Sequence, residues 1–274
     1  MLNKSNTRAL CIGLLASLFS ISVCADALDE VKEKGELVVG TEMQFAPFDF
    51  LENGKQTGLN ADIFKVVGEE MGVEVRFLDL PWASVLPGLS AKNFDLVGGP
   101  LIITKERKER YRFLTPIAEA TVALLKRAGD DSITAPEDIA GKEIGAGQGS
   151  AQLRALEHYA KTLNTPVEVK GFVDNNQAYA ALAVGRIDAV ANSLPNIGYV
   201  AKQRPNTFEV VQPPFGEPAY FSYMGRNDED SRALLDAISS IISEMKADGR
   251  LAELQEKWLG QSMDTPTGDF EPVM

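Results

Sequence analysis

The amino-acid sequence predicts an α/β protein of two lobes that are joined by two hinge crossings and enclose a ligand cleft. Short apolar runs alternate with amphipathic stretches in the first half of the 274-residue chain, and the same alternation returns in the second half. Two strand-like segments, Thr121 to Lys126 and Ala219 to Met224, flank the second half. A chain that leaves one lobe, builds another and returns places its ligand between them, so we interpret these two segments as the crossings.

The first lobe is predicted to have β-α-β-α-β order, which implies a parallel sheet covered by helices. Asn53-Gly54 indicates a turn after the first strand, and apolar residues at helical spacing follow it. The predicted elements are strands over Glu36 to Gly40, Val73 to Leu78 and Asp95 to Val97, and helices over Asn60 to Met71 and Trp82 to Ala91.

The segment from Phe94 to Phe113 is predicted to be the centre of the site. Its two apolar runs are separated by Gly98-Gly99-Pro100, which we interpret as a bent crossing, and Ile102 lies just beyond this bend. Glycines let peptide N–H groups approach a bound anion, and the planar guanidinium of Arg107 in the next helical turn can hold a carboxylate. The alternative is that Arg107 is one more solvated arginine in a basic stretch.

The second lobe repeats the alternation of short strands and helices, and the chain then ends in an amphipathic region broken at Asp248-Gly249. We expect this last region to pack against the first lobe. The predicted elements are strands over Lys142 to Ala146, Val167 to Val169 and Ile187 to Ala191, and helices over Ser150 to Thr162, Asn175 to Val184 and, with the break, Asp230 to Trp258.

The first 25 residues are typical of an export signal. Lys4 and Arg8 form a basic region, Ala9 to Val23 is apolar but too short to span a bilayer, and Val23-Cys24-Ala25 resembles a cleavage site. We therefore predict cleavage after Ala25 and export to a bacterial periplasm. A lipoprotein anchor on Cys24 is the competing interpretation, but the bulky Val23 disfavours it.

Charge and composition exclude several other classes of function. Removal of Lys4 and Arg8 takes the formal net charge from −12 to about −14, which argues against nucleic acid or anionic lipid as a partner. Both cysteines, Cys11 and Cys24, leave with the signal, so no disulfide is expected in the folded protein. With His158 as the only histidine and no Cys/His cluster, neither a catalytic triad nor a zinc site is expected.

A glycine-rich stretch, Gly145 to Ser150, resembles a phosphate-binding loop. Its spacing is not G-x-G-x-x-G, and no suitably placed acidic residue for a ribose follows it. We interpret it as a tight turn from a strand into a helix, whose N–H groups could meet a carboxylate. No cofactor is therefore expected.

Six short motifs follow one another along the chain: Phe45 to Phe48, Gly58 to Asp62, Phe94-Asp95, Ile103 to Arg107, Gly185 to Ala189, and Ala247 to Leu251 with Lys257-Trp258. In this order and spacing they closely resemble the polar-amino-acid-type (family 3) extracellular solute-binding proteins of ABC importers. The resemblance implies the two-lobed periplasmic-binding-protein fold, with residues 26–120 and 221–274 in lobe 1 and residues 121–220 in lobe 2. It also implies a small-molecule ligand, an inner-membrane ABC permease as partner and a monomer.

The resemblance also implies roles for individual residues. Arg107 corresponds to the arginine that holds the ligand carboxylate, Phe45 to an aromatic residue that stacks on the ligand, and Glu42 to an acid that reaches its distal end. Trp82 is expected to face Phe45 across the cleft. Lobe 2 is expected to contribute the start of its first helix, at Gly149, Ser150 and Ala151.

Two departures from the family pattern concern the ligand. Ile102 stands where amino-acid binders generally have Ser or Thr, and Asn192 stands where they generally have the aspartate that pairs with the α-ammonium group. A charge-assisted hydrogen bond contributes about 1.5–3 kcal/mol. Its loss would weaken the binding of a standard α-amino acid about tenfold to a hundredfold.

The remaining residues Phe45, Trp82, Glu42 and Arg107 suit a zwitterion whose cationic nitrogen is shielded or delocalised, because aromatic faces attract such cations. Ectoine-like solutes and betaines meet this description. The simpler alternative is that Trp82 is a core residue and Glu42 a solvated strand end. An alternative function is a periplasmic dehydratase of the cyclohexadienyl or arogenate type, for which Glu42 is the candidate acid.

Overall fold

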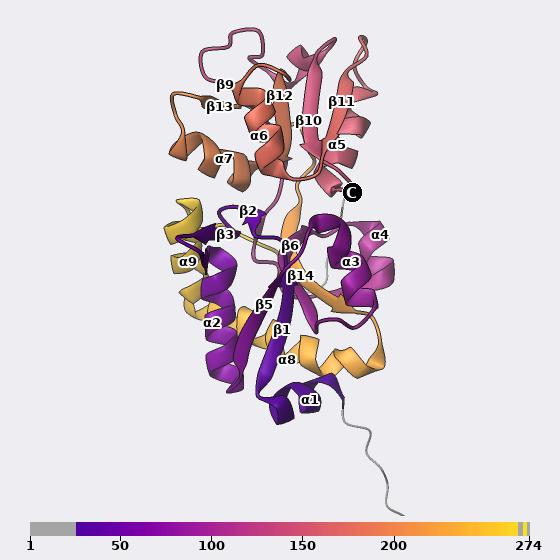
Figure 1. Ribbon diagram of the computed structural model, residues 1–274, viewed down its shortest axis with the longest axis vertical. Coiled ribbons are helices and arrows are strands. Elements are labelled where there is room, and N and C mark those ends of the chain that lie inside the picture. Colours follow the sequence, from indigo (N-terminus) through magenta and orange to yellow (C-terminus); the bar gives the residue numbers. More distant parts are fainter. Residues whose placement is uncertain (1–25, 268–270, 273–274) are drawn as a thin grey trace, which may run out of the picture.

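A β-sheet forms the centre of each of two α/β lobes in the computed structural model, which describes residues 26–267 and 271–272. The lobes are stacked along the long axis of the molecule, with helices on both faces of each sheet (Figure 1). The predicted signal peptide and both cysteines lie outside the described residues. The two-lobed α/β fold expected from the sequence is confirmed.

The sheet of lobe 1 is parallel where the sequence predicts it and antiparallel where the chain returns. β1 pairs in parallel with β5 and β6, whereas β14 runs antiparallel to β6 and β7. The strands in spatial order are β5 (Glu74–Asp79), β1 (Glu36–Thr41), β6 (Leu96–Ile102), β14 (Tyr220–Arg226) and β7 (Tyr111–Phe113), and the short β8 (Ala118–Glu119) also pairs with β14.

Helices that bury one apolar side against this sheet complete lobe 1. The break between the two C-terminal helices is at Gly249, whose φ of 93° a glycine adopts without strain. Asp62 ties α2 to α9, because its Oδ2 accepts hydrogen bonds of 2.7 Å from Lys257 Nζ and from Trp258 Nε1. The helices are α1 (Ala27–Lys34), α2 (Leu59–Met71), α3 (Trp82–Ser90), α4 (Lys105–Arg110), α8 (Glu229–Asp248) and α9 (Arg250–Leu259).

Lobe 2 has the same plan, with an inner parallel part and two antiparallel strands at one side. β10 pairs in parallel with β11 and β12, and β9 runs antiparallel to β12 and β13. The strands in spatial order are β11 (Glu168–Phe172), β10 (Glu143–Gly147), β12 (Ala189–Ser193), β9 (Val122–Arg127) and β13 (Phe208–Val211), and the helices are α5 (Ala151–Ala160), α6 (Asn175–Ala183), α7 (Leu194–Gln203) and the 3₁₀ turn Pro136–Ile139.

A small antiparallel sheet of β2 (Gln44–Phe45), β3 (Asp49–Glu52) and β4 (Lys55–Thr57) lies at the end of lobe 1 that faces lobe 2 (Figure 1). The predicted turn at Asn53-Gly54 connects β3 to β4, and both residues have positive φ, as a tight hairpin requires. This sheet was not predicted from the sequence. Its strands are two to four residues long, too short to give a periodic pattern.

The side chain of Asp49 fixes this small sheet to lobe 1. Asp49 is fully buried and accepts hydrogen bonds from Thr41 Oγ1 (2.8 Å), Asn60 Nδ2 (2.6 Å) and Gln56 Nε2 (3.2 Å). Burial raises the pKa of Asp49 to about 7, although these three donors act in the opposite direction. β1, β3, β4 and α2 therefore meet at one carboxyl group.

The chain path differs from the prediction in two places. Gly98-Gly99-Pro100 does not separate two strands, because β6 is continuous from Leu96 to Ile102. The sheet is nevertheless irregular at these residues: between its pairs with Met224 and Ser222, β6 has Gly98-Gly99-Pro100 where β14 has only Tyr223, so β6 bulges there.

The two segments interpreted as hinge crossings are mostly strands within the lobe sheets, β9 in lobe 2 and β14 in lobe 1. The actual crossings are shorter and lie next to each other. The N–H group of Ala120 donates a 2.7 Å hydrogen bond to the carbonyl oxygen of Ala219, immediately beside the β8–β14 pair. The chain therefore passes between lobes twice at the same place.

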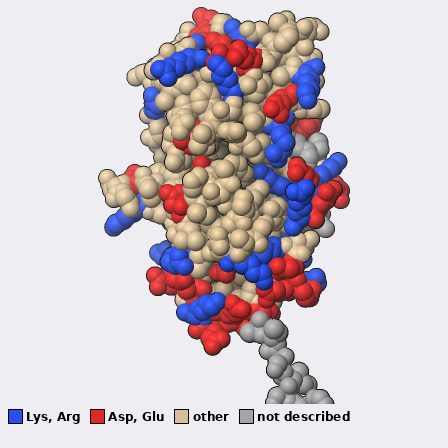
Figure 2. All heavy atoms as spheres, turned by 45° about the vertical axis from the view of Figure 1, so that its right-hand side comes forward, with Lys and Arg blue, Asp and Glu red and all other residues tan. Residues whose placement is uncertain are grey.

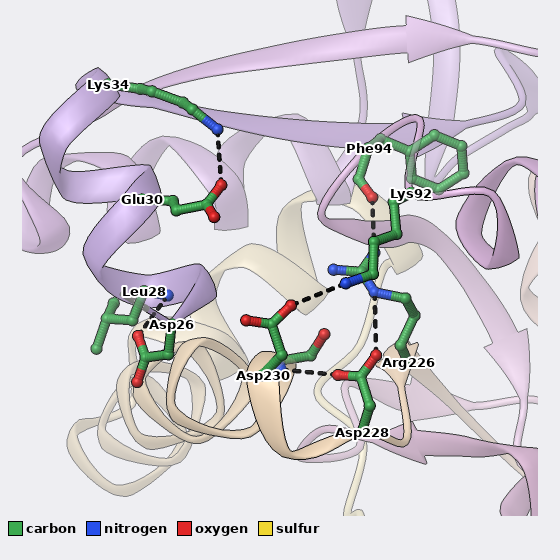
Figure 3. A network of polar contacts seen from close by, with 10 residues as sticks. Asp26, Leu28, Glu30, Lys34, Lys92, Phe94, Arg226, Asp228 and Asp230 are labelled. Carbon is green, nitrogen blue, oxygen red and sulfur yellow. Dashed lines mark hydrogen bonds and ion pairs between the residues drawn. The ribbon is translucent and has the colours of Figure 1, made fainter. Parts of the chain in front are cut away.

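At the far end of lobe 1, polar contacts hold the loop before β6 against the start of α8 (Figure 3). Arg226 donates a 3.0 Å hydrogen bond to the carbonyl oxygen of Phe94 and pairs with Asp228, which caps α8, while Lys92 pairs with Asp230 at 3.0 Å. Figure 2 shows acidic and basic side chains mixed at this end of the molecule, whereas uncharged residues cover much of the middle of that face. Within the described residues, no helix has the length and apolar character needed to cross a bilayer.

Candidate ligand-binding site

A cavity lies between the two lobes, and its empty space, part of which is open to solvent, is about 650 Å³. Both lobes contribute to its wall. Lobe 1 provides Thr41, Glu42, Phe45, Trp82, Val85, Val97, Gly99, Pro100, Leu101, Ile102, Arg107 and Phe221, and lobe 2 provides Gly147, Gln148, Ser150, Gln152, Val173, Asp174, Asn175 and Asn192. Nine of the eleven residues predicted for the site therefore line one cavity, and the other two, Gly149 and Ala151, are not among its lining residues.

Arg107 projects from α4 into this cavity and is 7% exposed. Thr104 caps α4 by accepting a hydrogen bond from the Arg107 N–H, and the guanidinium Nη1 donates a 2.9 Å hydrogen bond to the carbonyl oxygen of Ile102. Within the described part of the chain no carboxylate forms an ion pair with it, and burial, with a smaller effect of Arg154, lowers its pKa to about 10. The guanidinium is therefore a buried cation whose remaining N–H groups are available to an anion.

Trp82 lies beneath this guanidinium, with its ring centroid 5.6 Å from Arg107 Cζ. The ring also packs against apolar residues of α3 and β6, so the core and site interpretations of Trp82 both describe part of its surroundings. The ring contacts of Phe45 are with Phe48, at 6.0 Å between centroids, and with Phe221, at 5.8 Å. Phe45 and Trp82 line the same cavity but belong to different apolar clusters.

Glu42 follows the last residue of β1 and is half-buried in the cavity wall. Burial is the main cause that raises its pKa to about 7, followed by the charges of Asp174 and Asp79, while a hydrogen bond from the Trp82 N–H acts in the opposite direction. Glu42 is thus not a freely solvated strand end. A nearby cation would strongly favour its ionised form.

The edge of β6 forms part of the wall because β1 pairs only with its first residues, Leu96 and Val97. Gly99, Pro100 and Ile102 lie beyond this pairing and line the cavity. A Cβ atom at position 99 would come within 2.9 Å of Thr41 Oγ1, so a larger residue at this position would displace Thr41. The main-chain carbonyl oxygen of Ile102 accepts the hydrogen bond from Arg107. This contact does not depend on whether residue 102 has the hydroxyl group of Ser or Thr.

On the lobe 2 side, Ser150 caps α5 and accepts a 3.0 Å hydrogen bond from the Leu153 N–H. Asn192 is held internally, since its Nδ2 donates to Tyr179 Oη and its Oδ1 accepts from the Ser193 N–H, each at 2.8 Å. Gln152 Nε2 lies 3.4 Å from Asn192 Oδ1. Ala151, also predicted for the site, is the first residue of α5, is buried in the core and is not among the lining residues of the cavity.

Several polar residues that line the cavity were not predicted from the sequence, including Thr41, Gln148, Gln152 and Asp174. A general rule could have found some of them, because ligands of open α/β sheets bind beyond the carboxyl ends of parallel strands. Gln148 directly follows β10, and Asp174 comes two residues after β11. Among the described residues that line the cavity, the charged ones are Arg107, Glu42 and Asp174.

The lobes contact each other at the sides of the cavity. Asn196 on α7 donates a 2.8 Å hydrogen bond to the carbonyl oxygen of Ala46, and the rings of Tyr199 and Phe50 lie 5.9 Å apart. On the other side a Cβ on Gly149 would lie 3.8 Å from Trp82 Nε1. A ligand in this cavity is therefore largely enclosed.

Comparison with known proteins agrees with this architecture. The family model for bacterial extracellular solute-binding proteins, family 3, matches residues 37–261. The L-cystine-binding protein TcyJ of Escherichia coli (strain K12) is 32% identical over 254 residues, which cover 91% of this chain and 92% of that protein. The L-cystine-binding protein TcyA of Bacillus subtilis (strain 168) is 26% identical over 242 residues, which cover 87% and 86%.

Solved structures give the same result. An ancestral arginine-binding protein bound to arginine has a TM-score of 0.74 and 34% identity, with 82% of this chain and 98% of that chain covered. The ancestral amino acid-binding protein AncCDT-1, a precursor of cyclohexadienyl dehydratase, has a TM-score of 0.76 and 29% identity, with 85% and 99% covered. The fold, the matched residues and these relatives agree, and the chain belongs to the bacterial extracellular solute-binding proteins of family 3.

Proposed function

We propose that this protein captures a small carboxylate-bearing zwitterion in the periplasm and delivers it to an ABC permease of the inner membrane. In this proposal residues 1–25 are the export signal, residues 26–120 and 221–274 form lobe 1, and residues 121–220 form lobe 2. Among the relatives is a probable amino-acid ABC transporter-binding protein of Haemophilus influenzae (strain ATCC 51907 / DSM 11121 / KW20 / Rd), 28% identical over 258 residues. That relationship supports both the class of ligand and the type of partner.

The observation that carries the proposal is the guanidinium of Arg107, which is buried in the cavity wall without an acidic partner among the described residues. A buried charge is costly unless it is compensated, and a ligand carboxylate would compensate it with paired N–H···O bonds. Burial of the unpaired Arg107 guanidinium therefore destabilises the ligand-free protein, and a bound anion removes this cost.

The rest of the wall supports a cation on the same ligand. Both other charged residues in the described lining are carboxylates, Glu42 and Asp174, and the aromatic rings of Phe45 and Trp82 add surfaces that attract cations. Amino acids, ectoine-like solutes and betaines all combine a carboxylate with a cationic nitrogen. Because Asn192 is neutral and already bonded to Tyr179, we place the cation at Glu42.

A thermal-shift screen of amino acids including L-arginine, L-histidine and L-cystine, together with ectoine and glycine betaine, tests the ligand class, since a ligand that binds the folded state raises its melting temperature. For each hit, calorimetry should show that Arg107→Ala weakens binding at least about thirtyfold, the cost of leaving a ligand charge unpaired. Arg186→Ala, an exposed arginine of lobe 2, is the matched control. Unchanged affinity in Arg107→Ala would remove this residue from the site.

The dehydratase alternative depends on Glu42, whose pKa of about 7 suits a general acid. TcyJ, TcyA and the ancestral arginine-binding protein are all binding proteins, and the neighbour connected with cyclohexadienyl dehydratase is itself described as an amino acid-binding protein. Incubation with prephenate and detection of phenylpyruvate separates the two functions. Turnover would contradict a function limited to transport.

A further inference from the structure

Asp174 is an acidic residue of lobe 2 that contributes to the cavity wall. It caps α6, where Oδ1 accepts a 2.9 Å hydrogen bond from the Gln177 N–H and Oδ2 accepts a 2.7 Å hydrogen bond from Gln177 Nε2. These contacts hold the side chain in place. Helix capping alone does not require a charge, because Asn and Ser cap helices equally well.

Glu42 lies on the opposite lobe and lines the same cavity. It comes two residues before β2, and α6 packs against β2 across the gap between the lobes. The charge of Asp174 is, after burial, the largest cause of the raised pKa of Glu42. Contact between the lobes therefore brings two carboxyl groups of opposite lobes close enough to repel each other.

We infer that Asp174 and Glu42 together form a clamp for a ligand cation that carries N–H groups, such as an ammonium, guanidinium or amidinium group. The inference rests on the proposed function, because it assumes that Arg107 holds the carboxylate of the same ligand. Two carboxylates offer several acceptor lone pairs, which N–H groups can satisfy and a quaternary nitrogen cannot. Within the proposed ligand class, this favours amino acids with a distal cation and ectoine-like amidinium solutes over betaines.

The clamp also makes the binding of a ligand without a cation less favourable. When the lobes meet around a neutral or purely anionic solute, Asp174 and Glu42 repel each other without a cation between them. Specificity then comes from repulsion in the unwanted complex as well as from attraction in the correct one. A ligand that leaves the two carboxyl groups uncompensated makes closure less favourable.

The test compares ligands of similar shape with and without a distal cation, and it compares a cation that carries N–H groups with a quaternary one. L-arginine and L-lysine are compared by calorimetry with the neutral analogues L-citrulline and L-norleucine, and ectoine is compared with glycine betaine. In one or more of these three pairs, the mature protein is expected to bind the compound whose cation carries N–H groups at least tenfold more tightly than the other compound. Asp174→Asn should reduce this preference at least fivefold. Asp228→Asn, which changes the equivalent cap of α8 in lobe 1, should leave it unchanged.

Proton release distinguishes the clamp from a purely structural cap. Binding of a cation at pH 7 should expel a proton from Glu42, which is measured by calorimetry in buffers of different ionisation enthalpy. Asp174→Asn should reduce this release, because Glu42 then begins with a lower pKa.

The outcomes for the clamp and for the proposed function can be told apart. Equal binding of the neutral and cationic partners, or an unchanged preference in Asp174→Asn, would overturn the clamp while the carboxylate site at Arg107 stands. If no carboxylate of the panel binds, both the clamp and the proposed function are wrong. If Asp174→Asn is poorly folded, Asp174→Ser is used in its place, since serine also caps helices.

Discussion

The guanidinium carbon of Arg107 lies 5.6 Å from the ring centroid of Trp82, and both side chains line the cavity between the lobes. The indole is thus next to the group that is expected to receive the ligand carboxylate. An anion that binds Arg107 changes the electrostatic field on this ring. The contact gives the protein an internal reporter of ligand binding.

We expect ligand binding to change the intrinsic fluorescence, and we expect Trp82 to account for most of the change. The chain has two tryptophans, and the other, Trp258 on α9, is bonded to Asp62 of α2. Trp82→Phe should therefore lose most of the ligand-dependent signal, while Trp258→Phe should keep it. A full signal in Trp82→Phe would mean that the ligand does not reach the Arg107 end of the cavity.

Replacement of Arg107 by methionine is expected to stabilise the ligand-free protein while it abolishes binding. The change removes a buried cation that has no acidic partner among the described residues, and it keeps most of the apolar volume. We expect a gain of about 1–2 kcal/mol in the free energy of unfolding, which corresponds to a rise of about 2–8 °C in melting temperature for a chain of this size.

Calorimetric unfolding of the two proteins without ligand measures this gain. Arg186→Met replaces an exposed arginine and should change neither stability nor binding. A loss of stability in Arg107→Met would show that the hydrogen bond to Ile102 and the contact with Trp82 outweigh the cost of burying the charge.

The raised pKa of Glu42 predicts opposite effects of pH on stability and on ligand affinity. Between its ordinary value of 4.5 and the folded value of about 7, the folded protein binds more protons than the unfolded chain. The free energy of unfolding of the ligand-free protein should therefore fall as pH rises through this range, and Asp49, whose pKa is also raised to about 7, contributes in the same direction. The affinity for a cationic ligand should rise over the same range, because only ionised Glu42 attracts a cation.

Calorimetry and thermal unfolding between about pH 5 and pH 8 measure both slopes. The charged groups that act on Glu42 are Asp174 and Asp79, and Arg107 lies in the same cavity wall. Glu42→Gln should remove the pH dependence of affinity and leave the share of the stability slope that comes from the other carboxyl groups with raised pKa, such as Asp49 and Asp95. An affinity that is independent of pH in the unmodified protein would contradict the assignment of Glu42 to the cationic group.

The contact between Asn196 and the carbonyl oxygen of Ala46 is predicted to favour the closed arrangement of the lobes. Asn196 is 1% exposed, and its Oδ1 has no hydrogen-bond partner within the described residues, so loss of that atom offsets part of the loss of the bond. We expect Asn196→Ala to weaken ligand binding about twofold to fivefold. This is no more than the loss of one complete hydrogen bond, about 1 kcal/mol, would cause. Calorimetry measures the affinity, and Asn164→Ala, an exposed asparagine of lobe 2, is the control. Tighter binding in Asn196→Ala would show that the contact opposes closure.

The sequence predicts best those features that depend on local chemistry. The strand at Glu36, the helix start after Thr104 and the break at Gly249 were found because capping residues, glycine and apolar periodicity act over a few neighbouring positions. The α7 helix was missed because Pro195 and Gly198 interrupt its apolar pattern, although proline is favourable in the first turn.

Features that depend on distant parts of the chain could not be predicted in the same way. The bulge of β6 at Gly98-Gly99-Pro100 forms within one continuous strand because β14, which is more than 100 residues away, pairs with β6 on both sides of it. Asp174 has the local signature of an ordinary helix cap, and its place in the same cavity wall as Glu42 follows only from the packing of lobe 2 on lobe 1.

The hydrogen bond between Ala120 and Ala219 joins the two passages of the chain between the lobes into a single two-stranded ribbon. Such a ribbon bends readily across its width, but twisting or sliding of one passage past the other would break the bond. The lobes are therefore expected to approach one another about a single axis. Each closure then brings the same acidic side chains opposite each other, whichever solute has entered.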